Sequence, residues 1–145
     1  MSAELHKKNK YKYWRVTEIK ELFFYTLYQF HAYWNMGHID ANAAKKIYNF
    51  THRNLINYKI VLRSNELLHF LYRHFVEGNQ KQRGIHIQDI EKLPKVVNNL
   101  SFVQLEEDDK MIIKTQFPNS ETFVLVLKID IQKQQLLGKS FWIET

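Results

Sequence analysis

The sequence predicts an α+β fold in which N-terminal helices precede a roughly four-stranded antiparallel sheet, with the helices packed on one face of that sheet. Three observations support this fold class. Helix caps and helix-periodic apolar residues fill the first part of the chain, whereas β-rich segments between short polar breaks fill its end. The 145 residues, 45% of them hydrophobic, suffice for one buried core.

Residues 1–57 form a basic, aromatic-rich helical part in this interpretation, and residues 58–145 form an α+β domain; together they make one compact unit. Thr17 caps a first helix that ends at Gly37, and Asp40 caps a second helix over residues 41–54. The first helix is aromatic nearly all round, which favours burial in the core. A stacking platform for bases and a protein interface are the alternatives.

The middle of the chain alternates between strand and helix signals. The run YKIVLR (58–63) is β-branched and leads into a helix that is capped by Ser64 and stopped by Gly78. Polar, glycine-flanked residues then predict a loop over residues 77–84. The segment IHIQDIEKLPKVVNN (85–99) predicts a helical turn that is broken or restarted at Pro94.

The last part of the chain predicts an antiparallel meander, because four β-rich segments are separated by EDDK, PNSE and QKQQ. In the third of these strands, alternation places one set of residues on the core face: Phe123, Leu125, Leu127 and Ile129. In the last strand, Gly138, Ser140, Trp142 and Glu144 alternate against their neighbours. The polar face of the sheet then gathers Lys114, Lys128, Ser140 and Trp142, and plain solvation is the alternative explanation for it.

Positive charge is concentrated in the first half of the chain. Residues 1–63 hold 11 Lys and Arg against 4 Asp and Glu, and residues 64–145 hold 10 against 11, which gives the net charge of +6. The densest tract includes Lys8, Lys10 and Lys12 among tyrosines and a tryptophan, a composition that binds phosphates and stacks on bases. A solvated basic tail is the alternative.

Several classes of protein are disfavoured by what the sequence lacks. The chain contains no cysteine, which excludes disulfides, thiol nucleophiles and cysteine-based zinc sites. The apolar runs are shorter than the ~18 residues of a membrane span, and no secretory signal is visible. A soluble, cytoplasmic protein without a membrane partner is therefore expected.

Two histidines, His69 and His74, occur five residues apart on the helix that begins at Ser64. Helical phase places His69 opposite the apolar stripe, whereas His74 flanks that stripe near the end of the helix, next to Arg73. Two metal ligands on one helical face need a spacing of four residues, so no metal pair is predicted. His74 is a candidate general acid or base, and a histidine that merely closes its own helix is the alternative.

The order of these pieces resembles the phage-type branch of the barnase/EndoU/colicin/RelE-like nuclease superfamily over residues 58–145. The matching pieces are Arg73-His74 at a helix end, the segment 87–98 with Asp89, Leu93 and Pro94, the strand VLVLKI (124–129), and KSFW (139–142). The resemblance implies a toxin-like or phage-associated domain that cleaves RNA without a metal or other cofactor.

The resemblance also implies roles for individual residues. His74 would act as acid or base, Arg73, Lys114 and Lys128 would hold phosphate, Ser140 would donate a hydrogen bond to phosphate, and Trp142 would stack on a base. RNA, with tRNA as one candidate, is the expected partner, and a neutralising protein is a second. The sequence does not fix the oligomeric state. A non-catalytic module that binds nucleic acid or protein is the alternative function.

Overall fold

The computed structural model describes residues 14–28, 30–76 and 82–145, with the side chains of residues 72–76 and 82 outside this description. A single mixed sheet organises these residues, and its strands run in the order β1-β2-β3-β8-β7-β6-β5. These strands are β1 (Trp14–Val16), β2 (Ala32–His38), β3 (Lys59–Arg63), β5 (Phe102–Leu105), β6 (Lys110–Gln116), β7 (Thr122–Asp130) and β8 (Gln135–Glu144). A two-residue strand, β4 (Gln82–Arg83), pairs with the end of β8.

The predicted α+β class is confirmed, but the sheet is larger than the four antiparallel strands expected from sequence. The meander β5–β8 is antiparallel throughout, as predicted. β3 joins it by parallel pairing with the first residues of β8, and β2 and β1 extend the sheet beyond β3. β3 corresponds to the β-branched run predicted at residues 58–63, whereas β1 and β2 come from the part of the chain that was predicted to contain helices alone.

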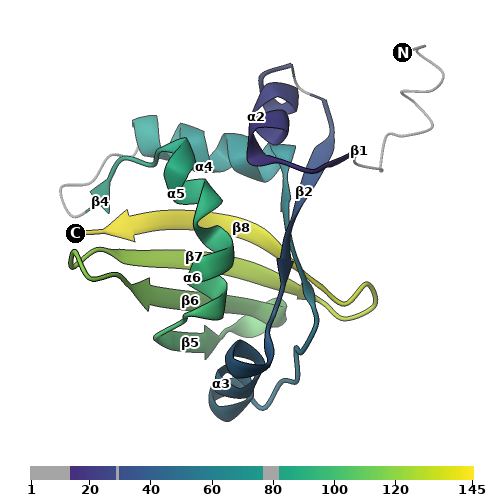
Figure 1. The fold of residues 1–145 in the computed structure, drawn as a ribbon, viewed down its shortest axis with the longest axis vertical. Helices are drawn as coiled ribbons and strands as arrows, with labels where there is room; N and C mark the ends of the chain where they lie inside the picture. The colour runs from purple at the N-terminus through teal and green to yellow at the C-terminus, as the bar shows by residue number, and fades with distance from the viewer. Residues whose placement is uncertain (1–13, 29, 77–81) are drawn as a thin grey trace.

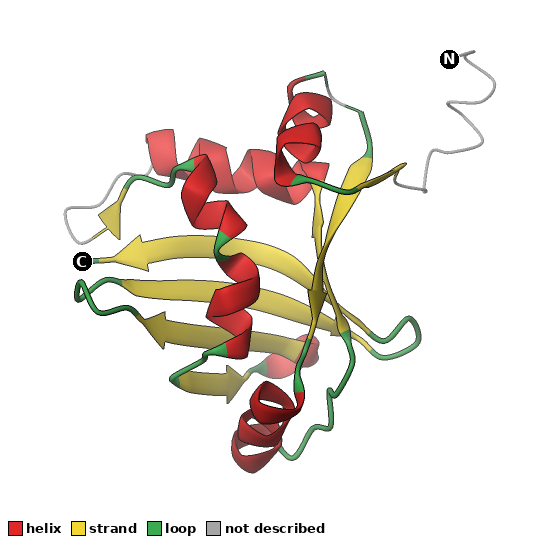
Figure 2. Ribbon diagram, in the orientation of Figure 1, coloured by secondary structure: helices red, strands yellow, loops and turns green. Residues whose placement is uncertain are grey.

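Helices cover one face of the sheet (Figures 1 and 2). α5 (Ile87–Glu91) and α6 (Leu93–Asn98) cross the meander, and α4 (Ser64–Val76) runs beside β8. α2 (Ile19–Leu27) packs against α4, and α3 (Ala41–Thr51) lies at the opposite end, near β5. The other face of the meander carries no helix among the described residues, and we call it the open face.

The predicted helix from Thr17 to Gly37 is wrong in its second half. α2 ends at Leu27, and residues 32–38 form β2 between β1 and β3. Ala32 and Met36 are both buried, and their spacing of four residues suits either a helix face or alternate positions of a strand. Pairing with two strands from other parts of the chain decides between these possibilities, so tertiary contacts override the local pattern.

The other predicted helices are present. Asp40 caps α3 by accepting a hydrogen bond from the Ala43 backbone N–H at 2.8 Å. α3 ends at Thr51 rather than residue 54, because His52 adopts a left-handed conformation with φ of 60°. The break near Pro94 separates α5 from α6, as predicted. The predicted end of the helix at Gly78 and most of the predicted loop lie outside the described residues.

A bulge changes the phase of β8. Val126 pairs with Ser140 whereas Leu127 pairs with Gly138, so Lys139 is an extra residue on β8. Leu136 and Gly138 face the core before the bulge, and Phe141 and Ile143 face it afterwards. The predicted alternation that placed Gly138 on the face of Ser140 is therefore wrong, whereas Ser140 and Trp142 do share a face.

The core lies between the helices and the sheet. The third strand of the meander contributes Phe123, Leu125, Leu127 and Ile129, all at most 3% exposed, as its alternation predicts. N-terminal residues such as Val16, Leu22 and Ile47 belong to the same cluster of buried side chains. Among the described residues, no helix has the length and apolar character needed to cross a membrane.

Candidate active site

The open face brings together four residues that the sequence proposes for the site: Lys114, Lys128, Ser140 and Trp142. Pairing across β6, β7 and β8 shows this, because Lys114 and Trp142 oppose Val124 from its two sides. Ser140 pairs with Val126, and both Val126 and Lys128 alternate with core residues of β7. The polar sheet face expected from alternation is therefore present.

These four residues are spread over a surface and do not meet at one point. Lys114 pairs with Val124, and four residues along β7 separate Val124 from Lys128, which corresponds to about 13 Å of strand. Lys128 lies directly opposite Lys110, and neither ammonium group forms an ion pair within the described residues, although Asp109 and Asp130 line a hollow beside Lys128. Like charges in this arrangement repel each other and attract an anion.

Ser140 and Trp142 differ in how they are held. The indole N–H of Trp142 donates to Glu144 Oε1 at 3.1 Å, which fixes the ring beside the end of β8. Within the described part of the chain, the Ser140 hydroxyl makes no hydrogen bond to protein, and its side chain is half-buried. Ser140 therefore has a free donor and acceptor that a phosphate oxygen can use.

The backbone of α4 carries Arg73 and His74 along the side of β8. Phe70 of α4 packs on Phe141 of β8 with ring centroids 5.9 Å apart. Position 73 follows Glu66 by seven residues, and so lies on the same side of the helix about two turns further along. Because the side chains of Arg73 and His74 lie outside the described residues, their approach to Ser140 stays a prediction.

A buried carboxylate connects the start of α4 to the bulge of β8. Glu66 Oε1 accepts hydrogen bonds from Arg63 Nε and from Lys139 Nζ, each at 3.1 Å. Glu66 is only 7% exposed, and its Oε2 is buried without a hydrogen-bond partner. The extra residue of the bulge thus supplies the ammonium group that holds α4 against β8. This role of Glu66 was not predictable, because Lys139 is 73 residues away in the sequence.

A second network holds the segment that leads into α5. Arg83 donates to both Asp89 oxygens at 2.8 Å, and also hydrogen-bonds the Glu121 carboxylate. Asp89 is 3% exposed and accepts the His86 backbone N–H as well. The Arg83 side chain therefore ties β4 both to α5 and to the turn before β7. Asp89 belongs to the motif that carries the family resemblance, but Arg83 was missed because its partners are distant in sequence.

The pKa values of Arg83, Asp89 and Glu121 are shifted in the directions that favour the charged form of each group. Burial raises the pKa of Asp89, but hydrogen bonds from Arg83 and the His86 backbone outweigh it and leave the pKa below its usual value. The hydrogen bond from Arg83 likewise lowers the pKa of Glu121, and both carboxylates raise the pKa of Arg83. All three groups are charged at neutral pH and satisfied by one another, which indicates a structural role.

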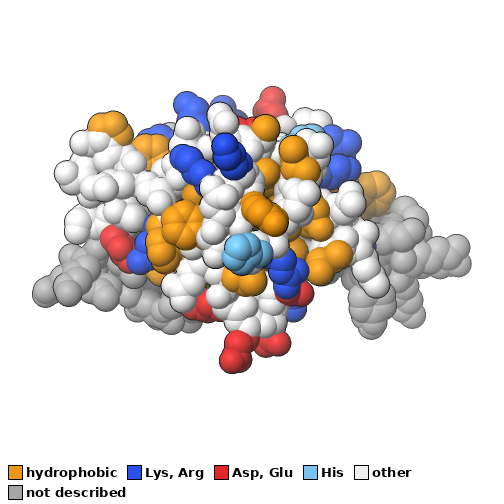
Figure 3. Space-filling view, turned by 90° about the horizontal axis from the view of Figure 1, so that it is seen from below, with side chains coloured by type: hydrophobic (Ala, Val, Ile, Leu, Met, Phe, Trp, Pro, Cys, Tyr) orange, Lys and Arg blue, Asp and Glu red, His pale blue; other side chains and the backbone are white. Residues whose placement is uncertain are grey.

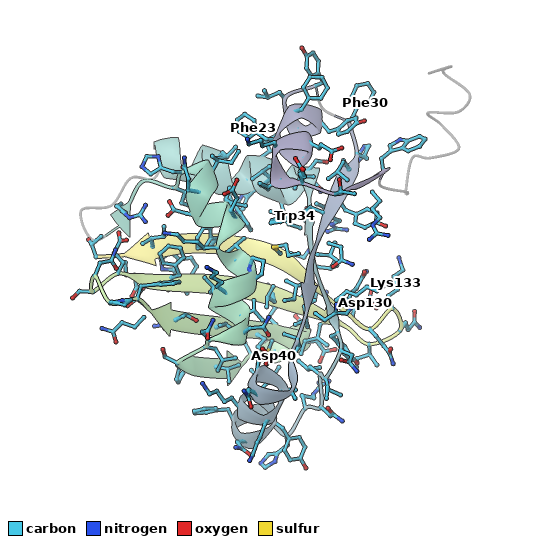
Figure 4. All side chains as sticks on the ribbon, viewed as in Figure 1. Phe23, Phe30, Trp34, Asp40, Asp130 and Lys133 are labelled. Atoms are coloured by element: carbon cyan, nitrogen blue, oxygen red, sulfur yellow. The ribbon has the colours of Figure 1, made fainter. Side chains whose placement is uncertain are left out.

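A cleft of about 470 Å³ opens where β1, β2 and β3 continue the open face beyond β8. Its lining is Arg15, Tyr33, Asn35, Lys59, Val61, Arg63, Asp130, Lys133, Gln135 and Leu137. Figure 4 shows Asp130 and Lys133 at the turn between β7 and β8. None of these residues was predicted for the site, because they come from four separate segments of the chain.

No metal site is found within residues 14–28, 30–76 and 82–145, where no three His, Asp or Glu side chains are grouped suitably for an ion. The acidic run at residues 106–109 is a turn, in which Asp109 pairs with Arg53.

Aromatic side chains gather at both ends of the molecule. Part of α2 is exposed, including Phe24 at 54% and Tyr28 at 63%, so this helix is less buried than expected. At the other end, seen from below in Figure 3, hydrophobic side chains alternate with Lys and Arg near α3, where Phe50 contacts Phe102. The predicted nucleic-acid contacts Lys8, Lys10 and Lys12 lie outside the described residues.

The sequence of this chain matches a known protein family. The family model described as phage-Barnase-EndoU-ColicinE5/D-RelE like nuclease 3 matches residues 35–145. The match begins within β2 and includes the whole meander, α4 and both carboxylate networks. No curated protein and no solved structure matches the chain significantly.

Proposed function

The chain belongs to this family of phage barnase/EndoU/colicin/RelE-like nucleases, and from that premise we propose that it is a metal-independent endoribonuclease of the toxin-like or phage-associated kind. The observation that supports the proposal is the open face, the side of β6–β8 that Lys114, Lys128, Ser140 and Trp142 share. The expected substrate is RNA, with tRNA as one candidate, and a neutralising partner protein is compatible with a toxin-like role.

The chemistry requires a base, an acid and cations around one phosphodiester. The base removes the proton from the ribose 2′-hydroxyl, the 2′-oxygen attacks phosphorus, and the P–O5′ bond breaks as the acid protonates the 5′-oxygen. The products are a 2′,3′-cyclic phosphate and a free 5′-hydroxyl. We assign proton transfer to His74, because α4 carries it along β8, on which Ser140 and Trp142 lie.

The other proposed site residues contact the phosphate or a nucleobase of the RNA. Of Arg73, Lys114 and Lys128, the cation nearest the cleaved bond stabilises the negative charge that builds up on the phosphorane oxygens, and the others bind neighbouring phosphates. Ser140 hydrogen-bonds one of these oxygens through a hydroxyl that has no protein partner within the described residues. Trp142 offers an aromatic face for the neighbouring base, and its contact with Glu144 limits its rotation.

Substitution of His74 tests the proposal directly. His74→Ala should lower kcat/KM for a single-stranded RNA by a factor of about 10²–10⁴, the range typical of losing a general acid or base. His69→Ala is the matched control, since His69 lies on the same helix and is exposed to solvent. Activity should persist in EDTA, and a substrate with 2′-deoxyribose at the cleaved position should resist cleavage.

Two results would overturn the proposal. One is wild-type protein with an intact fold that cleaves no RNA, including tRNA. The other is undiminished cleavage by His74→Ala. RNA binding without cleavage would favour the alternative of a non-catalytic nucleic-acid-binding module.

A further inference from the structure

The cleft beyond β8 is a continuation of the open face. Strand register shows this, because Tyr33 pairs with Arg63, Asn35 pairs with Val61, and Val61 pairs with Leu137. Neighbours that pair directly point to the same side of a sheet. Leu137 in turn pairs with Lys128, which alternates with core residues of β7. The hollow therefore opens on the same side of the sheet as Ser140 and Trp142.

Positive charge dominates the lining of the cleft. Arg15, Lys59 and Lys133 are exposed, and none of them forms an ion pair within the described residues. Arg63 differs, because its guanidinium is already paired with Glu66. The carboxylate of the lining, Asp130, accepts the Lys133 backbone N–H at 3.1 Å and so closes the turn between β7 and β8.

The other residues that line the cleft are suited to binding a nucleobase. Tyr33 lies half-buried on β2, and its ring can stack on a purine or pyrimidine. Val61 and Leu137 supply apolar surface from adjacent strands, whereas Asn35 and Gln135 supply amide groups. A mostly concave site of about 470 Å³ falls within the roughly 300–1,000 Å³ of small-ligand pockets. Cations at its rim and an aromatic ring inside are the two parts that a nucleotide needs.

The cleft adjoins the residues proposed for catalysis without including them, because Leu137 of its lining pairs with Lys128. Leu137 pairs with Lys128 and Ser140 pairs with Val126, two residues further along β7, which corresponds to about 7 Å along the sheet. Two of the cleft's lining residues, Arg15 and Tyr33, precede the region that matches the nuclease family. The N-terminal strands of this chain therefore add a site next to the family's sheet.

We propose that this cleft binds one nucleotide of the single-stranded RNA substrate, a short distance from the bond that is cleaved. Lys59, Lys133 and Arg15 bind the phosphates on either side of that nucleotide, and the base stacks on Tyr33. This assignment rests on the proposed ribonuclease function for its biological meaning. The binding itself is measured without cleavage, so that the two proposals can fail separately.

The charge contribution is tested with a fluorescently labelled single-stranded RNA that carries 2′-O-methyl riboses and cannot be cleaved by 2′-oxygen attack. Lys59→Ala combined with Lys133→Ala should raise Kd about tenfold at low salt and reduce the slope of log K against log salt by about 1.4, since each phosphate contact on a single strand contributes about 0.7. The control is Lys20→Ala with Lys45→Ala, an equal charge change at two exposed lysines on α2 and α3.

The contribution of nucleobase stacking to RNA affinity is tested with Tyr33→Leu. Affinity should fall about tenfold, as expected for the loss of one stacked base, while the salt slope stays unchanged. Urea unfolding of each variant identifies any that loses affinity by failing to fold. If both double variants weaken binding equally, or if Tyr33→Leu binds as wild type does, the cleft is not the site.

Cleavage assays on the same proteins separate the two proposals. If the nuclease and cleft proposals both hold, the cleft variants raise KM for unmodified RNA with little change in kcat, whereas His74→Ala mainly lowers kcat. Wild-type cleavage with unchanged KM in the cleft variants would overturn the cleft alone. Cleft-dependent binding by a wild-type protein that never cleaves RNA would overturn the nuclease alone.

Discussion

Two groups of charged residues lie on the same sheet and are organised in opposite ways. At the end of β8 that pairs with β4, Arg83 is enclosed by Asp89 and Glu121, and every charge has a partner. At the other end of β8, the exposed cations Arg15, Lys59 and Lys133 surround a cleft without forming ion pairs among the described residues. Paired charges stabilise the fold, whereas unpaired charges of one sign attract a ligand.

The contrast explains why a pKa shift is a poor guide to function in this protein. The groups with shifted pKa values are Asp89, Glu121 and Arg83, and their pKa values shift because the Arg83 cation and the two carboxylates stabilise each other's charge. Structural ion-pair networks perturb pKa values as active sites do. The residues proposed to bind RNA are instead recognised by charge without a partner, by shared orientation on the sheet and by a hollow between them.

The largest effect on stability is expected at Asp89. Asp89→Asn leaves the Arg83 guanidinium without its nearly buried partner, and breaking such a pair should lower the free energy of unfolding by about 3 kcal/mol. Urea unfolding measures this loss. Glu91→Gln, an exposed position on the same helix, should stay within about 0.5 kcal/mol of wild type. Equal stability of the two variants would show that the network does not hold β4 and α5 together.

Acidification should remove the same contribution gradually. The folded-state pKa values of Asp89 and Glu121 are lowered, and their unfolded values are about 3.9 and 4.3. Their stabilisation is therefore complete at pH values above the unfolded pKa, and it is lost as the pH falls through the folded pKa. The difference in unfolding free energy between wild type and Asp89→Asn should stay constant near neutral pH and shrink as the pH falls below about 5. A difference that also stays constant in acid would contradict ionic pairing as its cause.

The smallest effect, and one of opposite sign, is expected at Lys128. Lys128→Glu replaces repulsion across the Lys110–Lys128 pair by attraction, so it should raise the unfolding free energy by about 0.5 kcal/mol. The same change should weaken RNA cleavage, because it removes a cation proposed to hold phosphate. Lys128→Gln should give intermediate values of both quantities. A variant that loses both stability and activity would place Lys128 among the structural charges instead.

Local patterns in the sequence predicted the elements in which buried residues recur with the regular spacing of a strand or a helix. The alternation of Phe123, Leu125, Leu127 and Ile129 fixed the orientation of β7, and with it the open face that carries Lys128. The cap at Asp40 and the break at Pro94 were predictable for the same reason, since each acts on its immediate neighbours. These elements need no knowledge of the rest of the chain.

Features that depend on distant partners were not predictable. β2 is a strand because β1 and β3 flank it, although the spacing of Ala32 and Met36 suits a helix equally well. Arg83 finds Glu121 across 38 residues of chain. The cleft draws Arg15, Lys59 and Lys133 from three segments, and no short window of sequence contains more than one of them.

The single extra residue in β8 has a consequence for how this strand tolerates change in length. Leu137 and Ser140 face the same side only because Lys139 lies between them as a bulge. Deleting Lys139 would therefore leave strict alternation with Ser140 and Trp142 still on the open face and Phe141 and Ile143 still in the core, but it would remove the ammonium group that pairs with Glu66. Adding one further residue after Lys139 would instead turn Ser140 and Trp142 towards the helices, unless the strand formed a second irregularity. Relatives should therefore tolerate loss of the bulge residue better than a further insertion between residues 138 and 140.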